Sequence, residues 1–337
     1  MKKIGITTTV PSEVLIAAGC HPVDLNNILV NDPLPGRFLT IAERDGFPLN
    51  CCSWIKGIYG VCRESDIEDV VCVTGGDCTN TVMLMEVLKL KGFHTIDFAY
   101  PARPDIDEMQ RTLEEFAAVM GTTLGAAEAA RARLQSCRRL LRELDELTWG
   151  DNKVGGGENH LWLVSSSDFN GDYEQYEREL ADLVKECSQR RPYPPGELRL
   201  AYIGVPAVYA REFYRYLERH GARVVFNEVQ RQFAMPEPGK SLAEQYTSYT
   251  YPYSIRERLA DIGPQLKKRR IDGVIHYTQA FCHRAIGDII FRDALDLPVL
   301  TLEGNDDFSL NHHVRTRLEA FLDMLERRRN RRFSGPD

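Results

Sequence analysis

Short apolar runs alternate with helix-like segments over the first hundred residues. The run Asp69–Thr74 is β-branched and apolar, which is typical of a parallel strand covered on both faces. Strands separated by helices favour a parallel sheet. The predicted strands are Lys3–Thr8, Pro22–Leu25, Asp69–Thr74 and Thr95–Tyr100, and the predicted helices are Pro11–Gly19, Cys52–Tyr59 and Thr81–Leu90.

The pattern changes in the middle of the chain. Residues 105–147 carry almost no strand signal, and Ala, Leu, Arg and Glu recur there at helical spacing. A further helix is predicted over Tyr173–Ser188. The segment Pro192–Gly196 is rich in helix breakers and predicts a linker. We therefore expect a mainly helical region between two α/β segments.

Strand and helix signals alternate again from Leu198 to the last helix. The sequence thus predicts an α/β protein with two Rossmann-like, parallel-sheet domains that flank a helical region. The predicted domains are an N-terminal α/β domain over 1–103, a mainly helical region and linker over 104–195, and a C-terminal α/β domain over 196–337. The strands predicted in the last domain are Leu198–Ile203, Arg223–Asn227, Asp272–Thr278 and Pro298–Leu302, and the helices are Ala210–His220, Ser254–Lys268, His283–Ala294 and Val314–Arg328.

Composition and charge narrow the class of protein. Acidic residues outnumber basic ones by 49 to 42, which gives a net charge of -7. Such a balance argues against a nucleic-acid partner, since phosphate contacts need a basic face. No run approaches the ~18 apolar residues of a membrane-spanning helix, and the apolar stretch after Lys2 and Lys3 is too short for a signal peptide. We therefore expect a cytoplasmic protein with no membrane partner.

Nine cysteines are the main chemical feature of the chain. Disulfides are disfavoured in a reducing compartment, so metal binding or redox chemistry becomes the better explanation for some of them. Cys137 and Cys187 in helical patterns, and Cys72 inside a strand, are interpreted as buried core residues. A binding module whose cysteines are all buried and hold no metal is the alternative for the whole set.

Three cysteines occupy comparable positions. Cys78 follows one predicted strand, Cys282 follows another, and each stands just before a helix, while Cys52 opens a helix. A thiolate at a helix N-terminus is stabilised by free backbone N–H groups. Ligands gather at the carboxyl ends of strands in open parallel sheets. We therefore expect the three thiolates to converge on a metal site in the cleft between the two α/β domains.

Several longer sequence words surround these cysteines. They run through nearly the whole chain, and the last of them contains the motif Arg-Thr-Arg-Leu-Glu-Ala-Phe. The words are Pro11–Gly19, Cys52–Gly57, Asp69–Val71 leading to Cys78, Asp272–Ile275, Phe281–His283, Leu297–Leu300 and Val314–Phe321.

In this order the words resemble the 2-hydroxyacyl-CoA dehydratase family, which includes the 2-hydroxyglutaryl-CoA dehydratase D-component and benzoyl-CoA-reductase-type subunits. The resemblance implies that Cys52, Cys78 and Cys282 ligate a [4Fe-4S] cluster and leave one iron open, as in a catalytic metal site. It also implies an acyl-CoA substrate. An electron injected into the thioester would give a ketyl radical that expels a poor leaving group.

The resemblance also implies partner proteins. Family members receive their electron from a separate ATP-hydrolysing activator that carries its own cluster. The sequence contains no Gly-x-x-x-x-Gly-Lys-Ser/Thr motif, so the ATPase is expected to be another chain. A second, similar subunit or a second copy of this chain is the other expected partner.

Two residues are candidates for catalysis. Glu13 matches the glutamate of the family's early Pro-x-Glu word and would be a polar group near the substrate; the alternative is a first-turn glutamate favoured by the helix dipole. His283 follows Cys282 and would donate a proton or a hydrogen bond to sulfur; the alternative is a solvated histidine at a helix start.

Some features leave alternatives open. Cys51 adjoins Cys52 and is the alternative ligand, while Cys20 and Cys62 are extra thiols near the expected site. At the second cysteine the order is Asp77-Cys78, where family members often carry Cys-Asp. The alternatives for function are the reduction of an aryl-CoA ring and a non-catalytic [4Fe-4S] protein that carries electrons or serves as a scaffold.

Overall fold

The computed structural model describes residues 2–333, so 334–337 of the predicted C-terminal domain lie outside the described residues. The chain forms two compact units, each built from three segments. The predicted domain boundaries, after residues 103 and 195, stay predictions. Unit 1 comprises Met1–Arg142, Trp162–Leu183 and Gln232–Ser254, and unit 2 comprises Glu143–Leu161, Val184–Arg231 and Ile255–Asp337.

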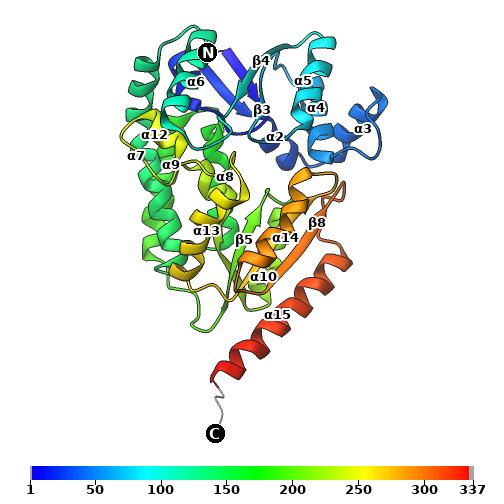
Figure 1. Ribbon diagram of the computed structural model, residues 1–337. Helices are drawn as coiled ribbons and strands as arrows, with labels where there is room; N and C mark the ends of the chain where they lie inside the picture. The colour runs from blue at the N-terminus through cyan, green and yellow to red at the C-terminus, as the bar shows by residue number, and fades with distance from the viewer. Residues whose placement is uncertain (1, 334–337) are drawn as a thin grey trace. The chain divides into compact units, whose positions relative to one another are not determined.

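Unit 1 is built on a four-stranded parallel sheet in the order β2-β1-β3-β4 (Figure 1). Its central strand β3 buries its first five residues, which explains the unbroken apolar run in the sequence. All four predicted strands are confirmed, with ends shifted by up to two residues. They are β1 (Lys2–Ile6), β2 (Cys20–Asp24), β3 (Asp69–Gly75) and β4 (His94–Ala99).

Helices cover this sheet and join its strands. Three helices that lie wholly in unit 1 were not predicted, namely α2, α3 and α12. Helix α4 packs so closely on α3 that a Cβ at Gly60 would overlap the backbone of Phe38. The helices of unit 1 are α1 (Ser12–Ala17), α2 (Leu25–Asn31), α3 (Gly36–Arg44), α4 (Ser53–Glu64), α5 (Asn80–Leu90), α6 (Ile106–Val119) and α12 (Leu242–Thr247).

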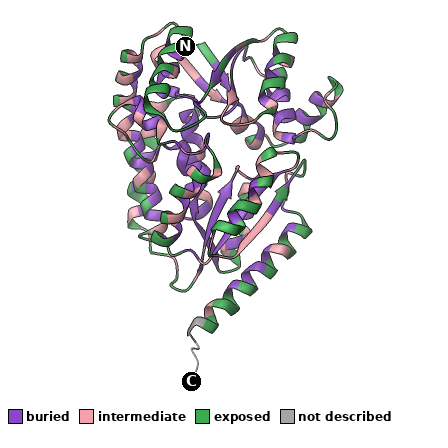
Figure 2. Cartoon of the chain, in the orientation of Figure 1, coloured by how far each residue is buried: buried purple, intermediate pink, exposed green. Residues whose placement is uncertain are grey.

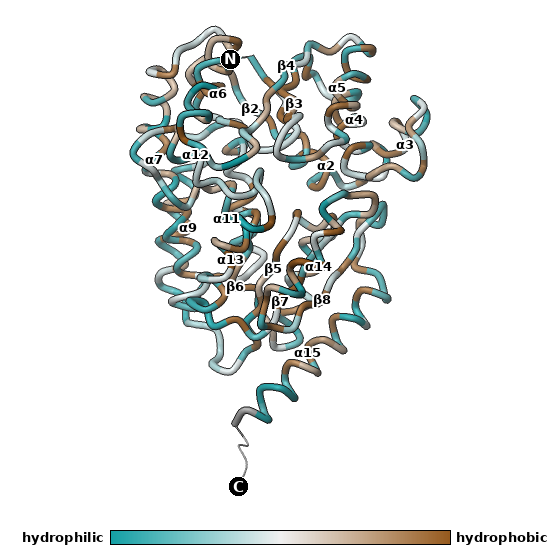
Figure 3. The backbone as a smooth tube through the Cα atoms, in the orientation of Figure 1, coloured by the Kyte–Doolittle hydropathy of each residue, from teal (hydrophilic) through white to brown (hydrophobic). Residues whose placement is uncertain are grey.

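Unit 2 holds a second four-stranded parallel sheet, in the order β6-β5-β7-β8. If the strands of each sheet are numbered along the chain, both sheets have the same spatial order: second, first, third and fourth strand. Strands β3 and β7 are therefore equivalent, as the third strand of each sheet. The apolar core includes Ile203, Val225 and Val274, and Figure 3 shows the hydrophobic character of β5. The strands are β5 (Leu198–Gly204), β6 (Ala222–Asn227), β7 (Gly273–Gln279) and β8 (Val299–Gly304).

The helices of unit 2 include one that differs from its prediction. The predicted helix His283–Ala294 is a short 3-10 segment, η3, followed by α14, because the first five residues close tighter turns. The last helix, α15, repeats buried residues along one side (Figure 2). The elements are α10 (Ala210–Arg219), α13 (Ile255–Lys268), η3 (His283–Gly287), α14 (Asp288–Ala294) and α15 (His312–Phe333).

Four further helices contain residues of both units. The helical character predicted for the middle of the chain is confirmed, and so is the α/β class with two parallel sheets. Over residues 2–333, no helix has the length and apolar character that a membrane span requires. The shared elements are α7 (Leu124–Trp149), α8 (Gly156–Val164), α9 (Tyr173–Gln189) and α11 (Glu228–Phe233), and η1 (Ser165–Ser167) and η2 (Phe169–Gly171) lie between α8 and α9.

Candidate functional site

Cys78 and Cys282 occupy equivalent positions in the two sheets. Strand β3 ends at Gly75 and β7 ends at Gln279, and each cysteine lies three residues beyond the end of its strand. In each sheet the second strand pairs with one edge of the first strand, and the third strand pairs with its other edge. The loops that hold the two thiols therefore follow the strand next to this switch point, where open α/β sheets bind ligands.

All three proposed ligands directly precede a helical turn. The carbonyl of Cys52 accepts a hydrogen bond from the N–H of Lys56 at 3.1 Å, at the start of α4. The carbonyls of Cys78 and Cys282 accept corresponding bonds at the starts of α5 and η3, at 3.0 and 3.1 Å. Nearby N–H groups at such ends lack partners within the helix. The predicted position of each cysteine is confirmed, and its role as a ligand stays a prediction.

The backbone before Cys282 is unusual. Phe281 adopts a φ of 63°, in the left-handed region that bulky residues avoid. Its side chain is also more than half exposed. The loop that presents Cys282 is thus held in a strained conformation, which is a frequent property of ligand sites.

The remaining thiols differ in their surroundings. Burial raises the pKa of Cys72 and Cys137 to about 12 and that of Cys187 to about 11. Burial also raises the pKa of Cys62. The protonated thiol is a poor ligand, so these four cysteines suit the core better than a metal site.

The donor set fits an iron–sulfur cluster in chemical type. Three thiolates are the soft ligands that such clusters take, and three rather than four leave one iron open. Cys52 and Cys78 belong to unit 1, and Cys282 belongs to unit 2. Among the described residues, there is no group of three or more His, Cys, Asp or Glu side chains placed so that it could hold a metal ion.

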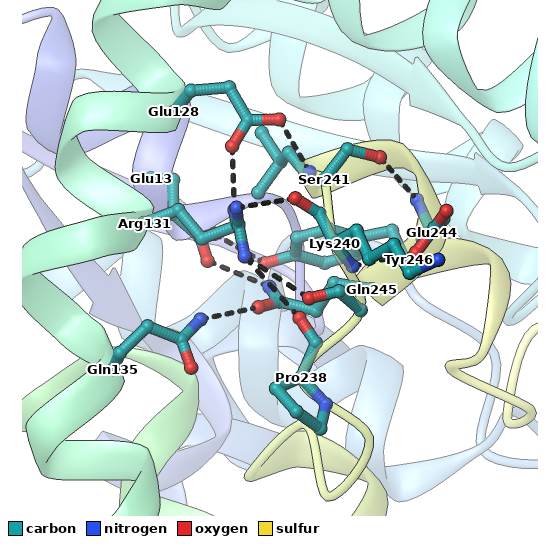
Figure 4. Close-up of polar contacts among 12 residues, drawn as sticks. Glu13, Glu128, Arg131, Gln135, Pro238, Lys240, Ser241, Glu244, Gln245 and Tyr246 are labelled. Atoms are coloured by element: carbon teal, nitrogen blue, oxygen red, sulfur yellow. Dashed lines mark hydrogen bonds and ion pairs between the residues drawn. The ribbon is translucent and has the colours of Figure 1, made fainter.

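Glu13 lies in a buried polar cluster of unit 1. Its carboxylate pairs with Arg138 of α7 at 2.5 Å and accepts hydrogen bonds from Tyr246 at 2.7 Å and Gln245 at 2.9 Å. Figure 4 shows Gln245 and Tyr246 directed at Glu13. Burial opposes its charged form, but the Arg138 guanidinium and these bonds outweigh burial, so the pKa of Glu13 is lowered. The ionised carboxylate therefore fixes α1, and the substrate contact predicted for it stays a prediction.

Sequence reasoning missed the partners of Glu13. A signal for Arg138 was present, because it stands four residues after Leu134 and three before Leu141, on the buried face of a helix. A charged residue at a core position needs a partner. The sequence around Gln245 and Tyr246 contains no pattern that predicts their hydrogen bonds to Glu13.

His283 lies at the first residue of η3. Its side chain is exposed, directly after Cys282 in the chain. The position agrees with either of the roles expected from the sequence, a donor to sulfur or a solvated helix-start histidine. Its catalytic role stays a prediction.

Two buried carboxylates meet at the end of β2, which sequence reasoning also missed. Asp168 accepts a hydrogen bond from the backbone N–H of Asp24 at 2.8 Å, and Ser167 donates to the Asp24 carboxylate at 2.6 Å. Burial and the neighbouring charge of Asp24 raise the pKa of Asp168 to about 7, and burial raises that of Asp24 as well. Both carboxylates are therefore buried at the start of α2, where the charge of one opposes ionisation of the other.

Comparison with protein-family models identifies one family over nearly the whole chain. Residues 7–325 match the model described as 2-hydroxyglutaryl-CoA dehydratase, D-component. The chain belongs to this family. The resemblance drawn from the sequence words is thereby confirmed, and the family is one of dehydratases.

Two other comparisons add no functional information. No curated protein matches the chain. A solved structure of the periplasmic heme-binding protein BhuT in complex with two hemes aligns over 96% of this chain and 99% of its own, at 12% identity and a TM-score of 0.21. A likeness so weak carries no argument about fold or ligand.

Proposed function

We propose that the chain is the iron–sulfur subunit of a 2-hydroxyacyl-CoA dehydratase-like enzyme, with a [4Fe-4S] cluster held by Cys52, Cys78 and Cys282. The observation that carries the proposal is the equivalent placement of Cys78 and Cys282, beyond the third strands of two sheets with the same strand order. This placement occurs in a chain that belongs to a dehydratase family.

The proposed cluster supplies electron transfer and an open iron site for an oxygen of the substrate. The chain's own residues hold its ligands at helix starts, where backbone N–H groups favour thiolates. Gly60 allows α4, and with it Cys52, to pack against α3. The buried Glu13–Arg138 pair fixes α1, which follows the loop after β1.

The proposal includes partners and a compartment. An ATP-hydrolysing activator with its own cluster would deliver one electron to the thioester, giving a ketyl radical anion that expels the 2-hydroxyl group as hydroxide. Loss of a proton from the neighbouring carbon and return of the electron would then give the 2-enoyl-CoA, so the net reaction is loss of water and the electron is recycled. A second similar subunit, or a second copy of this chain, completes the enzyme. We place the protein in the cytoplasm, where its thiols stay reduced.

The test is an anaerobic assay of the cluster-loaded chain with a dehydratase activator, ATP, a low-potential reductant and 2-hydroxyacyl-CoA thioesters. The expected product is the 2-enoyl-CoA. Dearomatised product from benzoyl-CoA, with no enoyl-CoA, would favour the aryl-CoA reductase alternative. Reduction of the cluster by the activator without conversion of either thioester would favour a non-catalytic electron carrier.

A further inference from the structure

Four hydroxyl groups in two segments of unit 1 are buried without a hydrogen-bond partner among the residues that the structure describes. They belong to Thr9, Thr247, Thr250 and Tyr253. Thr9 and Tyr253 are only 2% and 5% exposed. A buried hydroxyl that lacks a partner costs about 1–3 kcal/mol, so such a concentration needs a reason.

The two segments meet at Tyr100, directly after β4. The Tyr100 hydroxyl donates to the backbone carbonyl of Thr9 at 2.9 Å, and its ring lies 5.6 Å from that of Tyr249. A Cβ at Gly76 would lie 2.9 Å from the Cβ of Tyr100 and 2.8 Å from that of Pro252. Tyr100 and Pro252 therefore pack against the loop that begins at Gly76 and carries Cys78, and Thr9 lies on the other contact of Tyr100.

The chemistry of the hydroxyls defines the ligand. A hydroxyl both donates and accepts, so it suits carbonyl and alcohol oxygens. The segment 247–253 contains no Lys or Arg that would favour a phosphate or carboxylate. Burial and the negative charge of Glu108 raise the pKa of the Tyr253 hydroxyl, so this hydroxyl stays neutral and does not favour an anion beside it. The expected ligand group is therefore neutral and rich in oxygen.

We propose that Thr9, Thr250 and Tyr253 bind the 2-hydroxyacyl end of the thioester through its carbonyl and hydroxyl oxygens. The segment 247–253 then determines acyl specificity in unit 1, beside the loop that carries Cys78. The identity of the ligand rests on the proposed function, whereas the binding surface rests on the buried hydroxyls. No bond is made or broken by these residues, which orient the substrate.

The test uses three variants of the full, cluster-loaded chain: Thr9→Val, Thr250→Val and Tyr253→Phe. Thr95→Val is the matched control, because Thr95 also buries a hydroxyl with no partner in the described residues but lies near the start of β4. Equilibrium binding is measured for lactoyl-CoA and 2-hydroxyglutaryl-CoA, with propionyl-CoA and glutaryl-CoA as deoxy controls. The thermal midpoint of each variant is measured as well.

We expect each of the three variants to weaken binding of the 2-hydroxyacyl thioesters by about three- to tenfold. Their thermal midpoints should stay the same or rise, because an unsatisfied polar group has been removed. Thr95→Val should leave all dissociation constants unchanged. Weaker binding with an unchanged or higher midpoint is a signature that a purely structural hydroxyl does not produce.

Two results would overturn the inference while leaving the proposed function in place. One is wild-type affinity for the 2-hydroxyacyl thioesters in all three variants. The other is a thermal midpoint that falls by several degrees in these variants, which would assign the hydroxyls to the fold. Failure of the cluster-loaded wild-type chain to bind any of the thioesters would instead reject the proposed function, and the inference with it.

Discussion

Glu13 and Arg138 form an ion pair, with 2.5 Å between Oε1 and Nη2, in which both side chains are buried. The pair joins α1, which follows the first strand of unit 1, to α7. The two charged residues are 125 positions apart in the sequence. Gln245 bridges the two, because it donates to Glu13 and accepts from Arg138. A buried charge without its partner is costly, so replacing either residue alone should destabilise the fold.

Arg138→Met and Glu13→Gln should each destabilise the protein by about 3–5 kcal/mol, because each leaves a buried polar or charged group uncompensated. The double variant should lose less than the sum of the two. Urea unfolding of the four proteins measures the coupling. Single losses below about 1 kcal/mol, at the level of exposed ion pairs, would contradict the prediction.

The carboxylates of Asp24 and Asp168 should make stability fall as pH rises. The pKa of Asp168 is raised to about 7, so between about pH 4 and pH 7 the folded protein keeps a proton that the unfolded chain has lost. The unfolded state is therefore favoured progressively as pH rises through this window. Thermal midpoints measured from pH 5 to 8 test the sign.

Asp24→Asn should flatten this pH dependence and raise the thermal midpoint at pH 8. Asparagine still caps α2 by accepting from the N–H of Asn26, which Asp24 Oδ1 accepts at 2.9 Å, and it removes one of the two charges. Asp105→Asn is the matched control, since Asp105 caps α6 from an exposed position. An equal effect of both substitutions would contradict the role of the buried pair.

Gly60→Ala should destabilise unit 1 by about 1–3 kcal/mol, because the added methyl group would overlap the Phe38 backbone and force α3 away from α4. Gly36→Ala is the control: the same methyl group has open space there, at the start of α3. Chemical unfolding of both variants decides the question. Equal stability of the two would show that the helices are not in the close contact described.

The strands were predictable because they are short apolar runs whose signal is local, and some of them, such as β3 and β8, also end at a glycine, Gly75 and Gly304. Helix α8 was missed because Gly155, Gly156 and Gly157 weaken its local signal. In unit 2, Gly156 and Gly157 instead serve close packing, since a Cβ at either would crowd Val224 or Tyr214. Tertiary contact overrides local propensity there.

The candidate site was predictable only as far as local position. Each ligand cysteine was placed before a helix, and each lies there. The pairing of Arg138 with Gln245 spans 107 residues and leaves no local pattern, so one sequence could not reveal it. The coupling of Asp24 with Asp168 was hidden for the same reason.

The central claim is that Cys52, Cys78 and Cys282 hold one [4Fe-4S] cluster, and it is tested by iron and sulfide analysis with electron paramagnetic resonance of anaerobically purified protein. The wild type should contain about four iron and four sulfide atoms per chain. Cys52→Ser, Cys78→Ser and Cys282→Ser should each lose or alter the cluster, while Cys137→Ser, a core control, should retain it. Loss in Cys51→Ser with retention in Cys52→Ser would move one ligand by a residue. Folded wild-type protein without iron would show that these three cysteines do not hold a cluster.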